Sequence, residues 1–127
     1  MPTNIKSLIA RIQAALTPDL LSKTYQSCAN DHPVAGHCYI AAEALFHALG
    51  GKAAGLTAQV AKDPTGGTHW WLKDAKGARW DPTQEQYTDF GLEPPYAEGR
   101  NVGFLTRKPS RRARLILSRA GIPCATA

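Results

Sequence analysis

The stretch of sequence that decides the fold is GHCYIAAEALFHALGG, residues 36–51. Its apolar residues recur at the three- and four-residue spacing of a helix. One stripe of that helix consists of Cys38, Ala41, Ala42, Leu45 and Leu49. We therefore predict a helix from about Cys38 to Leu49. The glycine pair that follows can adopt the left-handed conformation with which helices commonly end.

Two more helices are predicted, one on each side of this central helix. The first follows Thr3, which can cap it, and ends at Thr17 and Pro18. Its helically spaced apolar residues are Ile5, Leu8, Ile9, Ile12 and Leu16. The last helix is predicted over Arg111–Arg119, with Ser110 as its cap.

Between the second and the last helix, the pattern changes to that of strands. Residues 68–73 and 78–81 flank a short turn and are rich in β-favouring residues, which predicts an antiparallel hairpin. The other predicted segments are a polar loop or broken helix at 22–36, strands at 52–62 and 102–106, and a long ordered loop at 84–101. Helices followed by antiparallel strands predict an α+β fold, with N-terminal helices packed on a small sheet and one C-terminal helix.

The composition is that of an ordinary globular domain. The 127 residues favour one domain over residues 1–127, long enough to bury a core without disulfides. With 43% hydrophobic and 20% charged residues, the chain is not a disordered tail, a collagen-like repeat or a coiled coil. No apolar run reaches the ~18 residues of a membrane span, and no signal peptide follows Met1, so we expect no membrane association. The 3 cysteines form no Cys-x-x-Cys pair, which favours a reducing compartment, so we expect a cytoplasmic protein.

The net charge of +5 comes largely from one basic patch near the C-terminus. The patch consists of Arg107, Lys108, Arg111, Arg112 and Arg114, with no acidic residue among them. Such a patch can contact phosphate, and therefore an acidic or nucleic-acid partner. The alternative is a solvated helix face, over which the arginine stems pack.

Cys38 lies at the predicted start of the central helix, directly after Gly36 and His37. Free backbone N–H groups and the positive end of the helix dipole stabilise a thiolate at such a place. The same N–H groups can stabilise an oxyanion after the sulfur has attacked a carbonyl. The alternative is that Cys38, which also lies on the apolar stripe, is a small buried hydrophobic residue.

A histidine and an aspartate lie at similar distances from the predicted hairpin turn. His69 opens one strand and Asp81 ends the other, so a register pairing residues whose numbers sum to 150 places both side chains on one face. Gly77 permits the bulged turn that selects this register. A histidine beside a thiol can take its proton and return it to a leaving amine, and a carboxylate can fix the histidine tautomer. The alternative is that His69 is packed structurally beside Trp70 and Trp71.

These motifs, taken in order, resemble those of transglutaminase-like and papain-like cysteine enzymes. Residues 36–50 place a cysteine at the head of a helix, and residues 68–73 read Thr-His-Trp-Trp-Leu-Lys. Residues 77–83 end in Trp-Asp-Pro-Thr, which is similar to the aspartate motif of transglutaminase-like domains. The run Asp-Pro-Thr-x-x-Gln at 81–86 also looks like small bacterial and phage proteins of the YunG type.

The resemblance covers roughly residues 34–87 and implies a papain-like core. It implies a cysteine-dependent acyl hydrolase or transferase without a cofactor, in which Cys38 is the nucleophile, His69 the base and Asp81 the residue that orients the histidine. The expected substrate is a peptide, a protein or a small amide, and the intermediate is a thioester.

The chain departs from papain-like enzymes in lacking a clear upstream oxyanion residue. The polar and aromatic residues that we consider for the oxyanion hole or the substrate groove are Gln26, Asn30, His32, His37, Tyr39, Trp70 and Trp71. For at least one of the two tryptophans, we expect packing in the core instead.

Two other functions compete with the enzyme. A metal site would use Cys28, His32, His37 and Cys38, but their spacing matches no common zinc motif, so we expect no metal. A catalytically silent papain-like scaffold would bind a protein or nucleic-acid partner through the basic C-terminal helix, because a fold does not determine a function.

Overall fold

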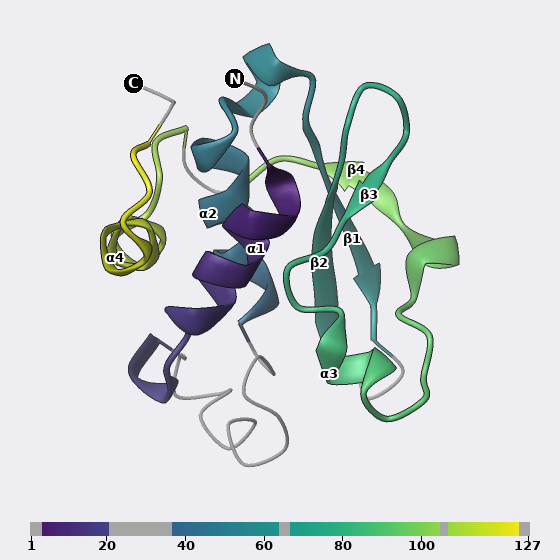
Figure 1. The fold of residues 1–127 in the computed structure, drawn as a ribbon. Helices are drawn as coiled ribbons and strands as arrows, with labels where there is room; N and C mark the ends of the chain where they lie inside the picture. The colour runs from purple at the N-terminus through teal and green to yellow at the C-terminus, as the bar shows by residue number, and fades with distance from the viewer. Residues whose placement is uncertain (1–3, 21–36, 64–66, 105–106, 125–127) are drawn as a thin grey trace.

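The structure, a computed structural model, describes residues 4–20, 37–63, 67–104 and 107–124 (Figure 1). Over these residues the chain has an α+β fold. Its α-helices are α1 (Ile5–Ala14), α2 (Cys38–Ala48), α3 (Glu85–Thr88) and α4 (Arg111–Ala120). Its strands are β1 (Thr57–Lys62), β2 (Thr68–Lys73), β3 (Arg79–Trp80) and β4 (Arg100–Val102). Short 3₁₀ helices are η1 (Pro18–Leu20), η3 (Gly51–Ala54) and η4 (Tyr96–Glu98).

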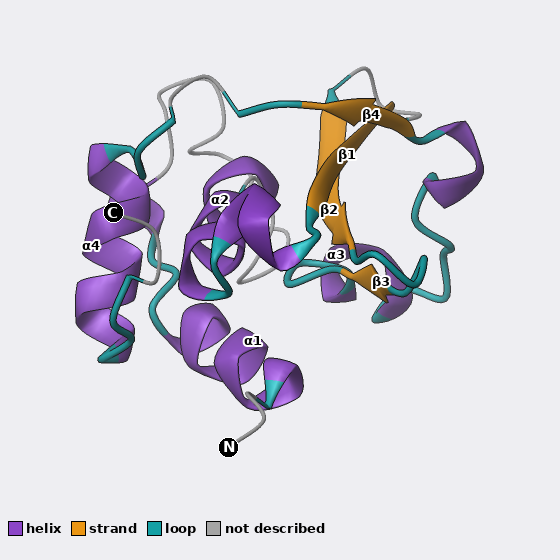
Figure 2. Ribbon diagram, turned by 90° about the horizontal axis from the view of Figure 1, so that it is seen from above, coloured by secondary structure: helices purple, strands orange, loops and turns teal. Residues whose placement is uncertain are grey.

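The strands form one antiparallel sheet in the order β3-β2-β1-β4. The central pair, β1 and β2, is aligned over six residues, with Val60 opposite Trp70. Figure 2 shows α1, α2 and α4 on one side of this sheet and the short helix η4 on the other. The sheet is therefore covered by helices on one side and by the connection from β3 to β4 on the other.

Helix α2 is the central helix of the molecule, and the prediction made for it is confirmed. It begins at Cys38 and ends before Gly50, which takes the predicted left-handed conformation with φ of 103°. Nearly all of its side chains are buried. The core around it is formed by Leu8 and Ile12 of α1, Ala113, Ile116 and Leu117 of α4, and Ala58 and Leu72 of the sheet.

A buried carboxylate fastens α2 to the last helix. Glu43 accepts hydrogen bonds from both the backbone N–H and the hydroxyl of Ser110, at 2.8 and 2.7 Å. Ser110 in turn caps α4, as predicted, because its hydroxyl accepts from the Ala113 N–H. The negative charge of Glu43 thus lies at the positive end of the α4 dipole.

The structure corrects four predicted boundaries. The cap of α1 is Asn4 instead of Thr3, since the Asn4 side chain accepts from the Ser7 N–H. The strand predicted from residue 52 begins at Thr57, because the alanine-rich segment before it forms η3. The expected loop at 84–101 contains α3 and η4, and β4 begins two residues before the predicted strand 102–106 and ends at Val102. Residues 22–36, predicted as a loop, lie outside the described residues.

The predicted hairpin is present, but its predicted register is wrong. Leu72 pairs with Trp80 and Lys73 with Arg79, so the numbers of paired residues sum to 152. Gly77 has φ of 84°, as the bulged three-residue turn requires, and that turn is centred on Lys76. Because the error is two residues and strands alternate with period two, the predicted face is preserved.

Candidate functional site

His69 and Asp81 form the centre of the site. His69 is the second residue of β2, and Asp81 follows the last residue of β3. In the observed register they are diagonal neighbours on one face rather than directly opposite each other. His69 Nε2 lies 2.6 Å from Asp81 Oδ2, and both side chains are buried. This hydrogen bond fixes the orientation of the imidazole ring and directs Nδ1 away from Asp81.

The other hydrogen bonds of the Asp81 carboxylate keep it oriented towards His69. Its Oδ2 also accepts from the hydroxyl of Tyr96, at 2.8 Å. Its Oδ1 accepts from the backbone N–H of Thr83 at 3.0 Å, and the Thr83 hydroxyl lies at 3.4 Å. Pro82 forces the chain out of the strand at this point, so the carboxylate can reach back to the residues that follow it.

The thiol of Cys38 lies at the first residue of α2 and beside the start of β2. Its Sγ donates to the backbone carbonyl of Thr68 at 3.4 Å, and Thr68 precedes His69 in the chain. The helix begins without a side-chain cap. As at any helix start, the first N–H groups of α2 have no acceptor within the helix.

His69 has an unusual protonation equilibrium, and both neighbours contribute to it. Burial alone lowers its pKa, whereas hydrogen bonds with Asp81 and with Cys38, and the charges of these two groups, raise the pKa to about 9. The imidazolium form is therefore favoured near neutral pH. The structure thus brings together the three residues predicted as catalytic, in the order thiol, imidazole, carboxylate.

Aromatic rings enclose the histidine. The Trp71 ring stacks on His69 with centroids 5.6 Å apart, and the Tyr87 ring meets it edge-on at 4.8 Å. Tyr96 packs against Trp71 at 5.1 Å, and Gly99 approaches the same indole so closely that no larger residue fits. These rings keep water from the His69–Asp81 hydrogen bond and strengthen it.

A protein-family model described as "YunG protein" matches residues 4–118. The chain belongs to the YunG family. The matched range includes Cys38, His69 and Asp81, and it extends well beyond the motifs at 34–87 that first suggested this relationship. No curated protein and no solved structure matches the chain significantly.

The other predicted site residues of this YunG-family chain lie in different places. His37 is fully buried, and its Nε2 hydrogen-bonds to the Thr17 carbonyl at 2.9 Å, so it anchors the chain before α2. Tyr39 and Trp70 pack edge to face at 4.7 Å, and Trp70 stacks on Phe104. The remaining candidates, Gln26, Asn30 and His32, lie outside the described residues.

Two arginines of the basic patch bind backbone carbonyls of the protein itself. Arg112 donates to the Leu20 carbonyl at 2.8 Å, and Arg114 Nε donates to the Pro109 carbonyl at 3.0 Å. These two arginines therefore hold α4 to its surroundings. All five residues of the patch are nevertheless exposed.

Sequence reasoning missed two polar contributors to the site. Tyr96 hydrogen-bonds to Asp81, and the side-chain amide of Gln86 lies 3.3 Å from His69 Nδ1 and 3.4 Å from the Thr83 hydroxyl. The signal for Gln86 was present, since it ends the Asp-Pro-Thr-x-x-Gln run. Tyr96 is one of the aromatic residues that follow the hairpin, but no motif indicated its contact with Asp81, which lies 15 residues before it in the chain.

Membrane-spanning helices and metal sites can be examined only over the residues that the structure describes. None of the described helices is long and apolar enough to cross a membrane. Within the ranges that the structure covers, no three histidine, cysteine, aspartate or glutamate side chains gather as metal ligands would. Cys28 and His32, two of the four ligands considered for zinc, lie outside those ranges.

Proposed function

We propose that this YunG-family protein is a cysteine-dependent acyl hydrolase or acyltransferase that acts on an amide bond of a peptide, a protein or a small molecule. The observation that supports this most is that the buried His69 interacts with both Asp81 and Cys38. Asp81 holds His69 through a 2.6 Å hydrogen bond, and Cys38 is a second side chain that interacts with the imidazole. Buried aromatic rings pack around the imidazole and keep it in position.

In the proposed resting state, the proton of the Cys38 thiol has already passed to His69, which gives a thiolate beside an imidazolium. The raised pKa of His69, about 9, favours this transfer, and the start of α2 stabilises the resulting thiolate. The sulfur then attacks the substrate carbonyl, forming a C–S bond. The imidazolium returns the proton to the leaving amine as the C–N bond breaks, which leaves a thioester on Cys38. Attack by water releases an acid, and attack by an amine releases a new amide, with the thiol restored in both cases.

The backbone at the start of α2 is the proposed oxyanion hole. The backbone N–H groups of Cys38 and Ile40 lie before the first intrahelical hydrogen bond, which the Ala41 N–H donates to the His37 carbonyl. They are therefore available to an oxyanion that forms beside Cys38 Sγ. Gln86, whose amide lies near His69 Nδ1, is proposed as a residue that positions the imidazole.

We also propose that the fold is a reduced version of the papain-like and transglutaminase-like core. The supporting features are a cysteine at the head of a buried central helix, a histidine at the start of one strand and an aspartate after the next strand. A reactive thiol persists in a reducing compartment, so we propose that the protein acts in the cytoplasm.

The scaffold alternative has less support. It requires the basic C-terminal helix to face a partner, but Arg112 and Arg114 use their guanidinium groups on backbone carbonyls of this chain. It also leaves unexplained why a buried histidine is paired with a buried aspartate next to a thiol, an arrangement in which two polar groups lose water.

The proposal is tested by alkylating the protein with iodoacetamide across a range of pH and locating the label by peptide mass spectrometry. Cys124 is exposed and serves as an internal reference thiol. We expect Cys38 to be alkylated faster than Cys124 at neutral and mildly acidic pH, because His69 and the helix start favour its thiolate. His69→Ala should remove this difference and leave the Cys124 reaction unchanged.

Catalysis itself is tested with a library of amide-containing peptides, with and without hydroxylamine. Wild-type protein should form an acyl adduct on Cys38, which hydroxylamine releases as a hydroxamate, and Cys38→Ala should form none. Cys124→Ala is the matched control and should behave as wild type. If Cys38 reacts only after unfolding, or if Cys38→Ala turns over the peptides as fast as the wild type, the enzyme proposal is wrong and the scaffold is favoured.

A further inference from the structure

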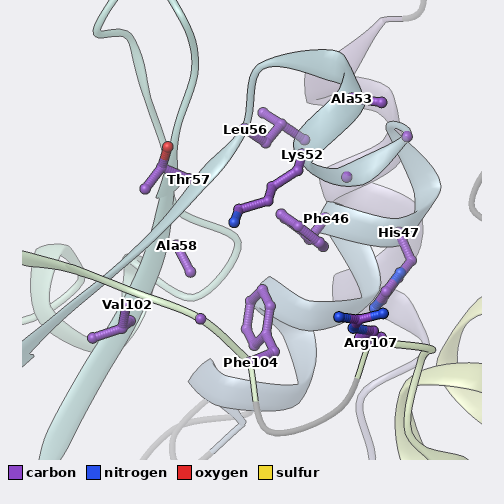
Figure 3. Close-up of a pocket in the computed structure, with 13 residues that line it drawn as sticks. Phe46, His47, Lys52, Ala53, Leu56, Thr57, Ala58, Val102, Phe104 and Arg107 are labelled. Atoms are coloured by element: carbon purple, nitrogen blue, oxygen red, sulfur yellow. The ribbon is translucent and has the colours of Figure 1, made fainter.

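The structure contains a cavity that the proposed chemistry does not use. It has a volume of about 590 Å³ and lies between the C-terminal part of α2, η3 and the strands β1 and β4 (Figure 3). This volume is within the range of about 300–1,000 Å³ that small-molecule sites occupy. Neither Cys38 nor His69 nor Asp81 lines it. The cavity is therefore a separate feature of the molecule.

The wall of the cavity is mostly apolar. Its main apolar side chains are Phe46, Leu56, Val102 and Phe104. Phe104 is held by rings on three sides, because it packs against Tyr39, Phe46 and Trp70 at centroid distances of 5.1 to 5.7 Å. These contacts keep the wall in shape and leave an apolar surface on which the body of a ligand can lie.

Two cationic side chains reach the same cavity. Lys52 extends from η3 into the space between α2 and β1, and Arg107 follows Phe104 along the chain (Figure 3). Among the residues that the structure describes, neither forms an ion pair, and the lining includes no aspartate or glutamate. His47 also lines the cavity, but burial lowers its pKa, so the positive charge comes from Lys52 and Arg107.

We propose that this cavity binds a small amphipathic anion, in which an apolar ring or branched chain carries one carboxylate group. The apolar body lies against Phe46 and Phe104, and the carboxylate lies between Lys52 and Arg107. The apolar area supplies affinity through burial, and the two cationic side chains supply selectivity for negative charge. This inference is independent of the acyl-transfer proposal, since it concerns other residues and a reversible binding event.

The test uses 8-anilinonaphthalene-1-sulfonate as the anionic probe and N-phenyl-1-naphthylamine, which has the same rings without the sulfonate, as the neutral probe. Fluorescence titration of the full-length chain should show one saturable site for the anionic probe, with affinity at least tenfold above that for the neutral probe. The preference should shrink at high salt, because salt screens the two cations. Backbone amide NMR shifts should change around Leu56, Ala58 and Val102.

The double variant Lys52→Met/Arg107→Gln should weaken binding of the anionic probe at least tenfold and leave binding of the neutral probe unchanged. Lys76→Met/Arg111→Gln is the matched control, since it removes the same charge at exposed positions away from the cavity and should bind as wild type. Both variants alter exposed side chains, and thermal melting checks that they fold. Equal affinity for the two probes, an equal loss in the control, or NMR shifts centred on the exposed Phe90 and Leu92 instead would overturn the inference.

Discussion

Asp81 divides its two carboxylate oxygens between two tasks. Oδ2 receives His69 Nε2 and the Tyr96 hydroxyl, whereas Oδ1 receives the Thr83 backbone N–H. One residue therefore orients the imidazole and also shapes the turn that leads into α3. A carboxylate with all of its acceptor sites in use has little freedom to rotate, and so the imidazole that it holds has little freedom as well.

The protonation of His69 predicts how stability depends on pH. Its folded pKa of about 9 lies above the ordinary value of 6.5, so folding stabilises the protonated form. This stabilisation is fully present below the unfolded pKa, near 6.5, and is lost as pH rises through about 9. At about 1.4 kcal/mol per pH unit, we expect a loss on the order of 3 kcal/mol in the free energy of unfolding, measured by urea titration between pH 6 and 10.

Asp81→Asn tests the origin of this dependence. An amide keeps the shape of the carboxylate but lacks its charge, so the pKa of His69 should fall and the decline in stability at alkaline pH should flatten. NMR titration of the imidazole ring measures that pKa directly. A variant that keeps the wild-type pH profile would show that the stabilisation does not come from Asp81.

Among the residues of the site, the sequence predicts those whose proposed role depends on a local structure. The roles of Cys38, His69 and Asp81 could be proposed from a helix start and a hairpin, because both are local structures. Tyr96 could not, because its contact with Asp81 depends on how the β3–β4 connection folds back over the sheet. Contacts of this kind are set by packing between distant segments, which a periodic pattern does not describe.

At the scale of elements, the β3–β4 connection is the part that encloses His69. Its short helix η4 brings Tyr96 to Asp81 and then passes Trp71 at Gly99. A Cβ atom at Gly99 would lie 2.5 Å from Trp71 Cζ2, and Trp71 is buried and cannot move aside easily. The glycine is required by this close approach.

Gly99→Ala should therefore destabilise the protein by about 1–3 kcal/mol, which is the usual effect of overpacking. Tryptophan fluorescence should report displacement of Trp71, and urea unfolding should report the loss. Gly103→Ala is the matched control: an added Cβ there meets nothing within 4 Å, so we expect little change. Similar losses in both variants would contradict this account of Gly99.

Another element contact joins α2 to α4 through Glu43 and Ser110. Glu43→Ala leaves a backbone N–H and a hydroxyl without their acceptor and opens space beside α4, so we expect a loss of about 2–4 kcal/mol in the free energy of unfolding. Glu43→Gln retains one acceptor oxygen and should lose less. Chemical denaturation of the two variants measures the difference, and equal losses would mean that the lost carboxylate decides the effect, whereas side-chain volume and the remaining acceptor oxygen contribute little.

The hairpin shows why elements are easier to predict than their alignment. The predictions of the aromatic strand 68–73 and of Gly77 as the turn glycine are both confirmed. The register was wrong by two residues because β3 is only two residues long, and the turn centred on Lys76 decides the pairing. In the same way, η3 was missed because its four residues are too few to show a helical period.

At the scale of the whole molecule, the first helix is fastened to the last. Arg11 of α1 donates to the Ala120 carbonyl at 3.1 and 2.8 Å and to the Gly121 carbonyl at 2.7 Å. These carbonyls end α4, where a positive charge is favourable to the helix dipole. Figure 1 shows α1 and α4 packed around α2, so this contact closes the helical layer.

Arg11→Met should lower the free energy of unfolding by about 1–2 kcal/mol, because the carbonyls at the end of α4 lose a charged donor. Thermal melting and urea titration both measure this. Arg111→Met is the matched control, since Arg111 lies at the start of α4, where a positive charge opposes the dipole. We expect the control to leave stability unchanged or to raise it slightly, and a loss equal to that of Arg11→Met would exclude the dipole explanation.

Because α4 covers α2, the apolar core can be completed only late in the synthesis of the chain. The apolar side chains of α1 and α2 leave the ribosome long before Ala113, Ile116 and Leu117, which bury them. Until then the nascent chain exposes an apolar helical surface, which is the kind of surface that chaperones bind. Ribosome-bound chains stalled before residue 111 should therefore be cut readily by proteases and retain chaperones, whereas chains in which α4 has emerged should be protected.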